Sequence, residues 1–247
     1  MQKKFEISPV DSSELSFKTK VALIDLIRSR EGDEPFKLPS EDQLAQMLGV
    51  SRNALRDVLA SLEEMGLVTR QRSKGTLANP RVARETCRLD TDPGLFSMIR
   101  QMGQEPRSQV TALGFRPERD PVLGEDSRSY LEICKLFYAD DAPVVFTIDH
   151  VDGGVAEGTE DQLPRLEHES CFTFLKECCH LPVAYSVATF DVMQADKRLQ
   201  SLFGVGPEEL FLVVDDTVYS RDMKIVCHAT SYYRKGYLPV KMLRKGW

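Results

Sequence analysis

Residues 38–52, LPSEDQLAQMLGVSR, contain the end signals of two successive short helices. Ser40 and Gln43 stand at the spacing of a capping box, so a helix is predicted to begin here. Gly49 is predicted to end it in a left-handed conformation, and Ser51 can cap a second helix directly afterwards. The second helix, which should end at Gly66, has an apolar face made of Leu55, Val58, Leu59, Leu62 and Met65. Two short helices joined by so tight a turn predict a helix-turn-helix unit.

A basic β-hairpin is predicted directly after the second helix. Residues 67–70 read as one strand, residues 76–78 as its return strand, and QRSKG at 71–75 as the turn. Such a hairpin is the wing of a winged helix-turn-helix, and Asn79-Pro80 closes the module, so residues 1–80 are assigned to one domain. Ahead of the quoted stretch, a further helix is predicted from Ser16 onward because apolar residues recur at helical spacing; they are Phe17, Val21, Ile24 and Ile27.

The exposed face of the second helix carries residue types that read DNA. A recognition helix enters the major groove by its N-terminal residues, and Arg52, Asn53 and Arg56 share one face there. Arginine can bind guanine, and asparagine adenine, through paired hydrogen bonds. The predicted DNA-binding residues, including those suited to phosphate, are Ser40, Ser51, Arg52, Asn53, Arg56, Arg70, Arg72, Lys74 and Gly75. A solvated face with ordinary surface arginines is the alternative, but the ordered set of cap, turn, basic face and wing favours DNA.

The remainder of the chain mixes helices with strand pairs. Helices are predicted at residues 95–102, 172–179 and 196–203, and strands at 110–115, 130–138, 143–151, 183–192, 210–219 and 224–233. Short turns at Asp140-Asp141 and at residues 221–223 join neighbouring strands into hairpins. The sheet should therefore be mostly antiparallel, and the fold class α+β. Residues 81–92 are predicted to be a linker and residues 93–247 a second domain.

The net charge of −6 does not exclude DNA, because the charge is unevenly spread. Residues 1–80 hold 12 basic and 12 acidic residues, whereas residues 81–247 hold 20 and 26. A local basic face is what matters for nucleic acid. No apolar run of about eighteen residues predicts a membrane span, and no secretory signal precedes the first helix. We therefore expect a cytoplasmic protein with no membrane partner.

Cysteine and histidine patterns predict neither a metal site nor a catalytic site. The six cysteines contain no C-x-x-C, and Cys178-Cys179-His180 has no second ligand pair at a suitable spacing, so packed, reduced thiols are expected. The histidines at 150, 168, 180 and 228 are scattered and are expected in surface or core roles. Because no nucleophile elbow or phosphate loop occurs, we expect no enzymatic activity and no cofactor.

The first domain resembles the DNA-binding domain of the GntR family. The resemblance rests on Leu38-Pro39-Ser40-Glu41, Leu48-Gly49-Val50-Ser51-Arg52, Leu55-Arg56, Leu62-Glu63-Glu64-Met65-Gly66-Leu67-Val68 and the wing Lys74-Gly75-Thr76. It implies that Ser51, Arg52, Asn53 and Arg56 contact the operator. Family members often carry an arginine after Pro-Ser-Glu where this chain has Asp42, so operator contacts there should be reduced or different.

The second domain resembles the UTRA domain of the HutC subfamily. The motifs are Ala139-Asp140-Asp141-Ala142-Pro143, Ser170-Cys171-Phe172, Leu202-Phe203-Gly204-Val205 and Ser231-Tyr232-Tyr233-Arg234. The resemblance implies a chorismate-lyase-like α+β fold, a homodimer formed through this domain, and a small-molecule effector held beside the antiparallel sheet.

The effector-binding positions implied by this resemblance are Lys135, Phe137, Thr147, Ser170, Phe172, Cys227 and Tyr233. Relatives that bind phosphorylated amino sugars have two arginines and two glutamates where this chain has Lys135, Phe137, Thr147 and Cys227. Loss of both guanidiniums weakens the case for a phosphate ligand, because lysine is only a point charge. We expect a less anionic effector, and a planar one is an option if Phe137, Phe146 and Phe172 form flat walls. The alternative is that these aromatics are core.

The leading hypothesis is a ligand-responsive repressor that binds double-stranded, palindromic operator DNA as a homodimer. Effector binding would then have different affinities for the DNA-competent and DNA-incompetent arrangements. The alternative is a metabolite-binding or enzymatic protein whose helix-turn-helix mediates protein contacts. Activation in place of repression also remains open.

Overall fold

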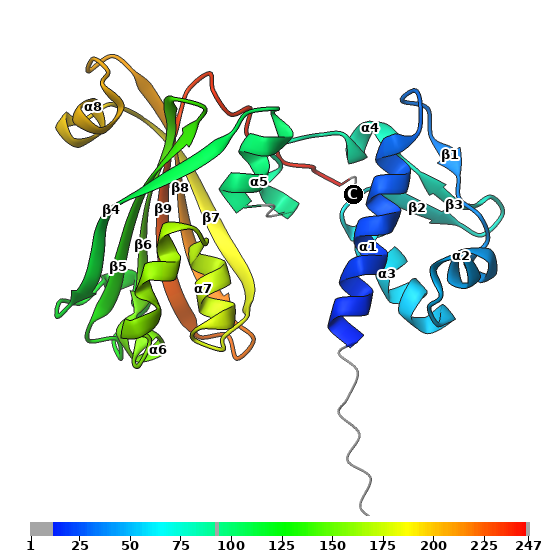
Figure 1. The fold of residues 1–247 in the computed structure, drawn as a ribbon, viewed down its shortest axis with the longest axis horizontal. Helices are drawn as coiled ribbons and strands as arrows, with labels where there is room; N and C mark the ends of the chain where they lie inside the picture. Colours follow the sequence, from blue (N-terminus) through cyan, green and yellow to red (C-terminus); the bar gives the residue numbers. More distant parts are fainter. Residues whose placement is uncertain (1–11, 92–93, 246–247) are drawn as a thin grey trace, which may run out of the picture. The chain divides into compact units, whose positions relative to one another are not determined.

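The computed structural model describes residues 12–91 and 94–245. Its contacts divide the chain into two compact units, Met1–Asp92 with Lys241–Trp247, and Pro93–Val240. Figure 1 shows the helices and strands of each unit. Within the described ranges no helix has both the length and the apolar character needed to cross a membrane.

The first unit is a winged helix-turn-helix with a small antiparallel sheet of order β1-β3-β2. Its elements are α1 (Ser12–Ser29), β1 (Phe36–Lys37), α2 (Glu41–Leu48), α3 (Arg52–Glu64), β2 (Val68–Gln71), β3 (Gly75–Ala78) and α4 (Pro80–Ala83). The predicted helix-turn-helix and wing are confirmed. The strand β1 escapes prediction because it is two residues long, too short to show alternation.

The predicted end signals of α2 and α3 have the expected geometry. The Gln43 backbone N–H donates to Ser40 Oγ at 3.3 Å, and the Ser40 N–H donates to Gln43 Oε1 at 3.0 Å, which completes the capping box. Gly49 ends α2 with φ of 66°, a left-handed conformation that glycine adopts without strain. Ser51 Oγ accepts from the Ala54 N–H at 3.2 Å and starts α3.

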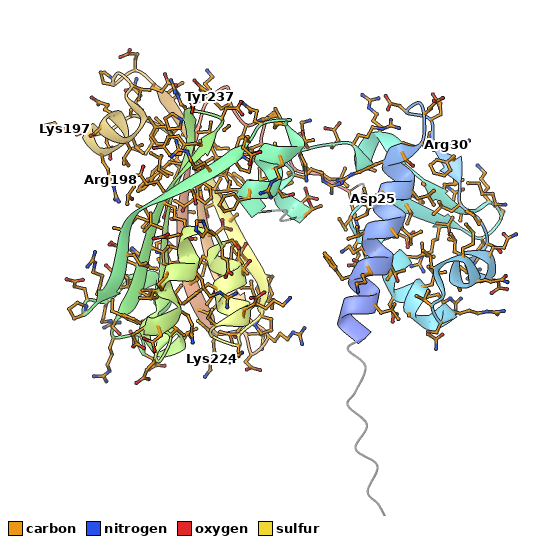
Figure 2. All side chains as sticks on the ribbon, viewed as in Figure 1. Asp25, Arg30, Lys197, Arg198, Lys224 and Tyr237 are labelled. Atoms are coloured by element: carbon orange, nitrogen blue, oxygen red, sulfur yellow. The ribbon has the colours of Figure 1, made fainter. Side chains whose placement is uncertain are left out.

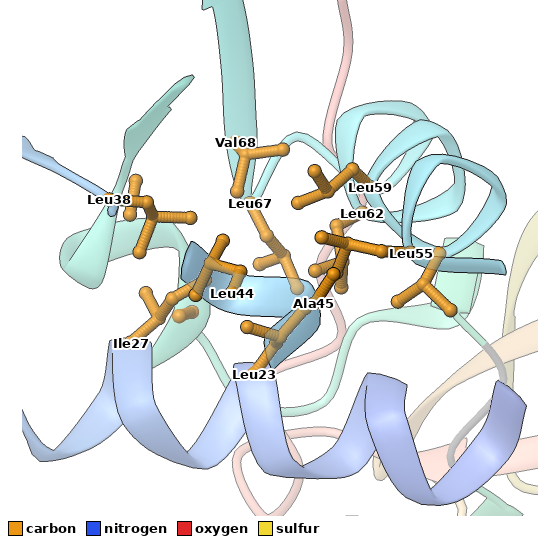
Figure 3. Packing of buried hydrophobic residues seen from close by; sticks show 13 residues of the cluster. Leu23, Ile27, Leu38, Leu44, Ala45, Leu55, Leu59, Leu62, Leu67 and Val68 are labelled. Atoms are coloured by element: carbon orange, nitrogen blue, oxygen red, sulfur yellow. The ribbon is translucent and has the colours of Figure 1, made fainter. Parts of the chain in front are cut away.

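Apolar side chains from α1, α2, α3 and the wing form the core of this unit (Figure 3). Leu55, Leu59 and Leu62 of α3 are fully buried, as their helical spacing predicts. In α1, however, Leu23 and Ile27 supply the buried face, while Phe17 is 66% exposed. The helix also begins at Ser12 and not at Ser16, because polar residues extend its first turn without adding to the apolar pattern.

Residues predicted as linker pack against the segment that begins at Lys241, within the first unit. The Lys241 N–H donates to Cys87 O at 2.9 Å, and the Leu89 N–H donates to Lys241 O at 3.0 Å. Arg88, only 5% exposed, donates to Met65 O at 2.9 Å. The unit therefore includes residues 81–92 and the chain end from Lys241, whereas the sequence divides the chain into 1–80, a linker at 81–92, and 93–247. Backbone pairing between such distant short segments leaves no periodic signal in the sequence.

The second unit is built on a six-stranded antiparallel sheet of order β4-β5-β6-β9-β8-β7. Its strands are β4 (Pro106–Arg116), β5 (Tyr130–Ala139), β6 (Ala142–Asp152), β7 (Val183–Gln194), β8 (Leu210–Ser220) and β9 (Ile225–Arg234). The predicted hairpins β5–β6 and β8–β9 are confirmed, and the antiparallel α+β prediction with them.

Helices cover both faces of this sheet. They are α5 (Gly94–Gln101), α6 (Gly153–Ala156), α7 (Cys171–Glu177) and α8 (Lys197–Phe203), with 3-10 segments η1 (Leu89–Thr91) in the first unit and η2 (Pro121–Leu123) and η3 (Glu160–Glu167) in this one. The face toward which Lys135 points, the Lys135 face, packs against α6, η3 and α7 (Figure 1). The opposite face, the Phe146 face, packs against α8, whose Arg198 (labelled in Figure 2) lies 4.6 Å from the Phe146 ring centre.

Candidate nucleic-acid interface and effector site

The N-terminal turns of α3 present a polar face to solvent. Arg52, Asn53 and Arg56 are exposed, while the opposite side of the helix is buried in the core. Ser40 and Ser51 are exposed caps of α2 and α3. This is the arrangement that a recognition helix needs, because base-reading side chains can reach a groove without disturbing the core.

Both arginines predicted to read DNA form ion pairs with acids of α2. Arg52 Nε lies 2.7 Å from Asp42 Oδ1, and Arg56 Nε lies 3.0 Å from Glu41 Oε2. The two pairs are largely exposed, and pairs of this kind contribute about 0.2–1 kcal/mol, so the guanidiniums can be released to DNA. If Arg52 contacts DNA as the sequence predicts, Asp42 would compete with the DNA for its guanidinium.

Removing the negative charge of Asp42 should strengthen DNA binding. We expect Asp42→Asn to raise affinity for any DNA sequence about two- to five-fold at low salt, because breaking an exposed pair of up to about 1 kcal/mol no longer opposes binding. Fluorescence anisotropy on operator and random duplexes would measure this. Glu64→Gln, an exposed acid at the other end of α3, is the control. Unchanged affinity of the Asp42 variant would show that the Arg52 pair does not oppose binding.

The wing places its basic residues unequally. Arg70 is tied to Glu63 of α3, with Arg70 Nε and the Arg70 N–H each 2.8 Å from the carboxylate, and these contacts lower the pKa of Glu63. Arg70 therefore helps to fix the wing against α3. Arg72 and Lys74 are exposed at the hairpin turn, and Gly75 has φ of 85°, which glycine accommodates.

An exposed lysine at the tip of a wing is suited to a phosphate. We expect Lys74→Ala to weaken binding to all duplexes alike and to lower the slope of log affinity against log salt by about one. Salt titrations on operator and random DNA would measure both quantities. Loss of sequence discrimination with an unchanged salt slope would contradict a phosphate role for this residue.

Five of the predicted effector residues lie on the Lys135 face. Lys135 pairs in register with Thr147, and Tyr233 with Val145, which itself pairs with Phe137. Cys227 pairs with Val151 on the same face. All of these predicted residues are buried; Lys135, Phe137, Thr147, Cys227 and Tyr233 are 0–7% exposed. The strand register thus brings together side chains up to about a hundred positions apart in sequence.

Lys135 is a buried amine with a carboxylate neighbour, Asp149, that is missing from the predicted effector residues. Its Nζ donates to Glu169 O, and it faces the Asp149 carboxylate across the hairpin. Burial lowers the pKa of Lys135 and raises the pKa of Asp149 to about 7. Asp149 is two positions after Thr147 on the same strand, and that alternation was the available signal.

Three of the predicted effector residues, Ser170, Phe172 and Phe137, make capping or packing contacts within the fold. Ser170 Oγ caps α7 by accepting from the Thr173 N–H at 3.0 Å. Phe172 packs partly buried against the core of the Lys135 face. Phe137 packs edge-on against Phe96 with ring centres 5.4 Å apart. These contacts favour the core interpretation of both phenylalanines over flat walls of a ligand site.

The side chain of Glu169, whose backbone oxygen accepts from Lys135, has a carboxylate oxygen without a donor among the described residues. Glu169 Oε2 is buried and has no hydrogen-bond partner among the described residues, whereas Oε1 accepts from Arg165 at 2.8 Å. A buried acceptor without a donor costs about 1–3 kcal/mol. Such an atom is a ready binding point for an N–H or O–H group of a ligand.

Two family descriptions match the chain. Residues 18–77 match "Bacterial regulatory proteins, gntR family", and residues 101–237 match the UTRA domain. The second match alone covers more than half of the 247 residues.

Similar proteins include regulators that the chain matches over most of their length. The uncharacterized HTH-type transcriptional regulator YurK of Bacillus subtilis is 22% identical over 222 residues, 87% of this chain and 90% of the relative. The HTH-type transcriptional repressor NagR of the same organism is 23% identical over 216 residues, 84% of this chain and 85% of the relative.

Solved structures share the fold. The possible transcriptional regulator YydK from Bacillus subtilis superposes with a TM-score of 0.74 at 14% identity, covering 94% of this chain and 99% of that one. PhnF from Mycobacterium smegmatis superposes with a TM-score of 0.58 at 18% identity, covering 93% and 100%.

Proposed function

Since the chain belongs to the GntR family of bacterial regulatory proteins and carries a UTRA effector-binding domain, we propose that it is a homodimeric repressor whose hold on operator DNA changes when a small molecule binds at the Lys135 face. A ligand-responsive, DNA-binding transcriptional regulator is the function common to this family; repression, the dimer and the effector class are the proposal's own content. A protein that acts on operator DNA works where the chromosome lies, so we also propose a cytoplasmic location.

The observation that carries the DNA-binding role is the exposed face of Arg52, Asn53 and Arg56 on a helix whose other side is core. The test is binding of the full chain to duplex DNA from upstream of its own gene, measured against random duplex over a salt gradient. Specific binding with steep salt dependence is expected. Equal, weak binding to both duplexes would instead favour a protein-contact role for the helix-turn-helix.

The edge strand β7 supports the homodimer. It spans Val183–Gln194 and is exposed over most of its length, with apolar Tyr185, Val187, Phe190 and Val192 each 42–61% exposed. Long apolar edge strands are a hazard unless they are covered, because their unpaired backbone groups can bind another strand. A second copy of the chain, pairing along β7, would cover it and place two recognition helices on one palindromic operator.

The charges on the Lys135 face support an effector of low negative charge. Asp149 faces Lys135, and Asp216 lies on the same face, paired in register with Ala229. Burial raises the pKa of Asp216 as well. Where these carboxyls are ionised, a phosphate dianion meets two negative charges and only one ammonium, whereas a ligand with N–H or O–H donors would satisfy Glu169 Oε2.

We expect amino-sugar phosphates to leave the melting temperature unchanged at millimolar concentration. The reason is repulsion between the phosphate and the ionised form of the Asp149 and Asp216 carboxyls. Differential scanning fluorimetry with glucosamine 6-phosphate, and with unphosphorylated glucosamine as the matched compound, would isolate the effect of the phosphate. The true effector should stabilise by linkage, about 2.7 kcal/mol at a hundred times its Kd. Stabilisation by the phosphate, with release of DNA, would overturn the low-charge proposal.

A further inference from the structure

Asp120 lies beneath two histidines on the Phe146 face. His150 of β6 and His228 of β9 are directly paired in register, one position away from Asp149 and Ala229 of the other face. Asp120 starts η2, where its Oδ1 accepts from the Val122 N–H at 2.8 Å. Its Oδ2 lies 2.6 Å from His150 Nδ1 and 2.7 Å from His228 Nδ1. The three ligand-type atoms all lie within 4.8 Å of one another.

The hydrogen bonds of His228 determine whether its Nδ1 carries a proton or a lone pair. Its Nε2 lies 3.1 Å from Asp215 Oδ2, which also accepts from Thr230 Oγ1 at 3.1 Å. Because a carboxylate only accepts, Nε2 carries a proton. In the neutral ring Nδ1 is then a lone pair that points at a carboxylate oxygen, and two acceptors at 2.7 Å repel each other. A proton or a metal ion must therefore lie between the two atoms.

We propose that Asp120, His150 and His228 bind one divalent transition-metal ion of the zinc class, with Asp215 orienting His228 from behind. Two imidazole nitrogens and a carboxylate oxygen are a donor set that zinc prefers, and they leave a fourth tetrahedral position for water. A carboxylate that accepts from the far nitrogen of a ligand histidine is the usual outer partner of such sites, since it fixes the tautomer and raises the basicity of the ring.

Access and spacing are compatible with an ion. The Asp120, His150 and His228 side chains are 6%, 20% and 16% exposed, so the cluster is sheltered but reachable from solvent. Zinc bonds of about 2.0–2.1 Å in a tetrahedral site place ligand atoms about 3.3 Å apart. The present separations of 2.6 and 2.7 Å suit hydrogen bonds, so the ligand atoms would have to move apart by about 0.6–0.7 Å.

The neighbourhood would hold the ligands in place. Tyr130 stacks on His150 with ring centres 4.1 Å apart. On the adjoining strands β4 and β5, Arg116 Nη2 lies 2.6 Å from Glu132 Oε2. Because Asp120 precedes η2 while both histidines belong to the sheet, a bound ion would fasten the η2 segment to β6 and β9.

A second cluster with metal-ligand residues is a weaker candidate. Asp149, Cys171 and Cys227 also approach within 4.8 Å on the Lys135 face. There the Lys135 ammonium already faces Asp149 and supplies the cation. The Asp120 cluster has no lysine among its described partners, and its neighbouring acid Asp215 adds negative charge.

The test is zinc binding by the full chain after EDTA treatment and dialysis. Isothermal titration calorimetry with zinc chloride should give one ion per chain at micromolar or tighter Kd, and cobalt(II) should give the visible absorption of a tetrahedral site. Asp120→Asn, which keeps the Oδ1 cap of η2, should weaken zinc binding at least a hundred-fold. Asp215→Asn should weaken it about 10- to 100-fold with one ion still bound. His168→Gln, an exposed histidine of the same unit, should change nothing.

Circular dichroism of each metal-free variant would establish that it is folded before titration. Zinc should also raise the melting temperature of the wild type and not that of Asp120→Asn. The proposal is overturned if the folded wild type binds no zinc at 100-fold excess over protein, which would leave a proton as the bridging cation. It is equally overturned if Asp120→Asn binds zinc as tightly as the wild type.

Discussion

Replacing Arg52 and Arg56 by alanine should each reduce operator affinity by about 1–3 kcal/mol, roughly 5- to 150-fold. A bidentate arginine–guanine contact discriminates bases by this amount, and both residues lie exposed on the face of α3 that would enter the groove. Each arginine forms an ion pair with an acid in the free protein, and DNA binding breaks that pair. The measured loss of binding free energy is therefore the free energy of the DNA contact less that of a weak ion pair.

The matched control for these variants is Arg221→Ala, an exposed arginine in the turn between β8 and β9. Melting temperatures should be unchanged in all three proteins, since none of the arginines contacts the core of α3. Anisotropy titrations on operator and on single-base variants would separate base readout from charge: a base-reading arginine loses discrimination at one position. If both α3 variants bind the operator like the wild type, the recognition face lies elsewhere.

The winged helix-turn-helix is predictable from sequence because its signals are local. The signals are the Ser40 capping box, the left-handed Gly49 and the Ser51 cap, and each of them joins residues at most four positions apart. The apolar residues of α3 also repeat at helical spacing. Hairpins β5–β6 and β8–β9 are equally local, since a short turn joins two alternating strands. Even so, sequence does not show that Arg52 is paired with Asp42, because that contact links two different helices.

Features that depend on distant pairing escape sequence analysis. Asp120 meets His150 and His228 over separations of 30 and 108 residues, so the spacing rules for metal ligands cannot find the cluster. The return of Lys241 to Cys87 is likewise a pairing of short irregular segments. The role of Phe137 also depends on a distant contact: the sequence leaves a ligand wall and a core side chain open, and the packing of Phe137 on Phe96 favours the core.

The homodimer proposal leads to the other large effect. A dimer reads two half-sites at once, so linking the two recognition helices can raise affinity by about 10²–10⁴ over one helix alone. Separating the protomers should remove this gain although α3 is untouched. The residues to change are Val187 and Val192 of β7, 57% and 61% exposed, where a charge costs the isolated chain little.

We expect the double variant Val187→Lys, Val192→Lys to be monomeric and to bind the operator at least a hundred-fold more weakly than the wild type. Lysines along an edge strand prevent pairing with another strand, because joining two such edges would bring like charges together and desolvate them. Sedimentation velocity would give the mass, and anisotropy the affinity, while circular dichroism would verify the fold. Met223→Lys, in the turn between β8 and β9 and 74% exposed, adds the same kind of charge away from β7, and this control variant should stay dimeric.

Full-length and half-site duplexes should bind the monomeric double variant equally, while the wild type prefers the full operator. A double variant that remains dimeric would move the interface to another surface, and a monomer that keeps full affinity would mean that one recognition helix suffices.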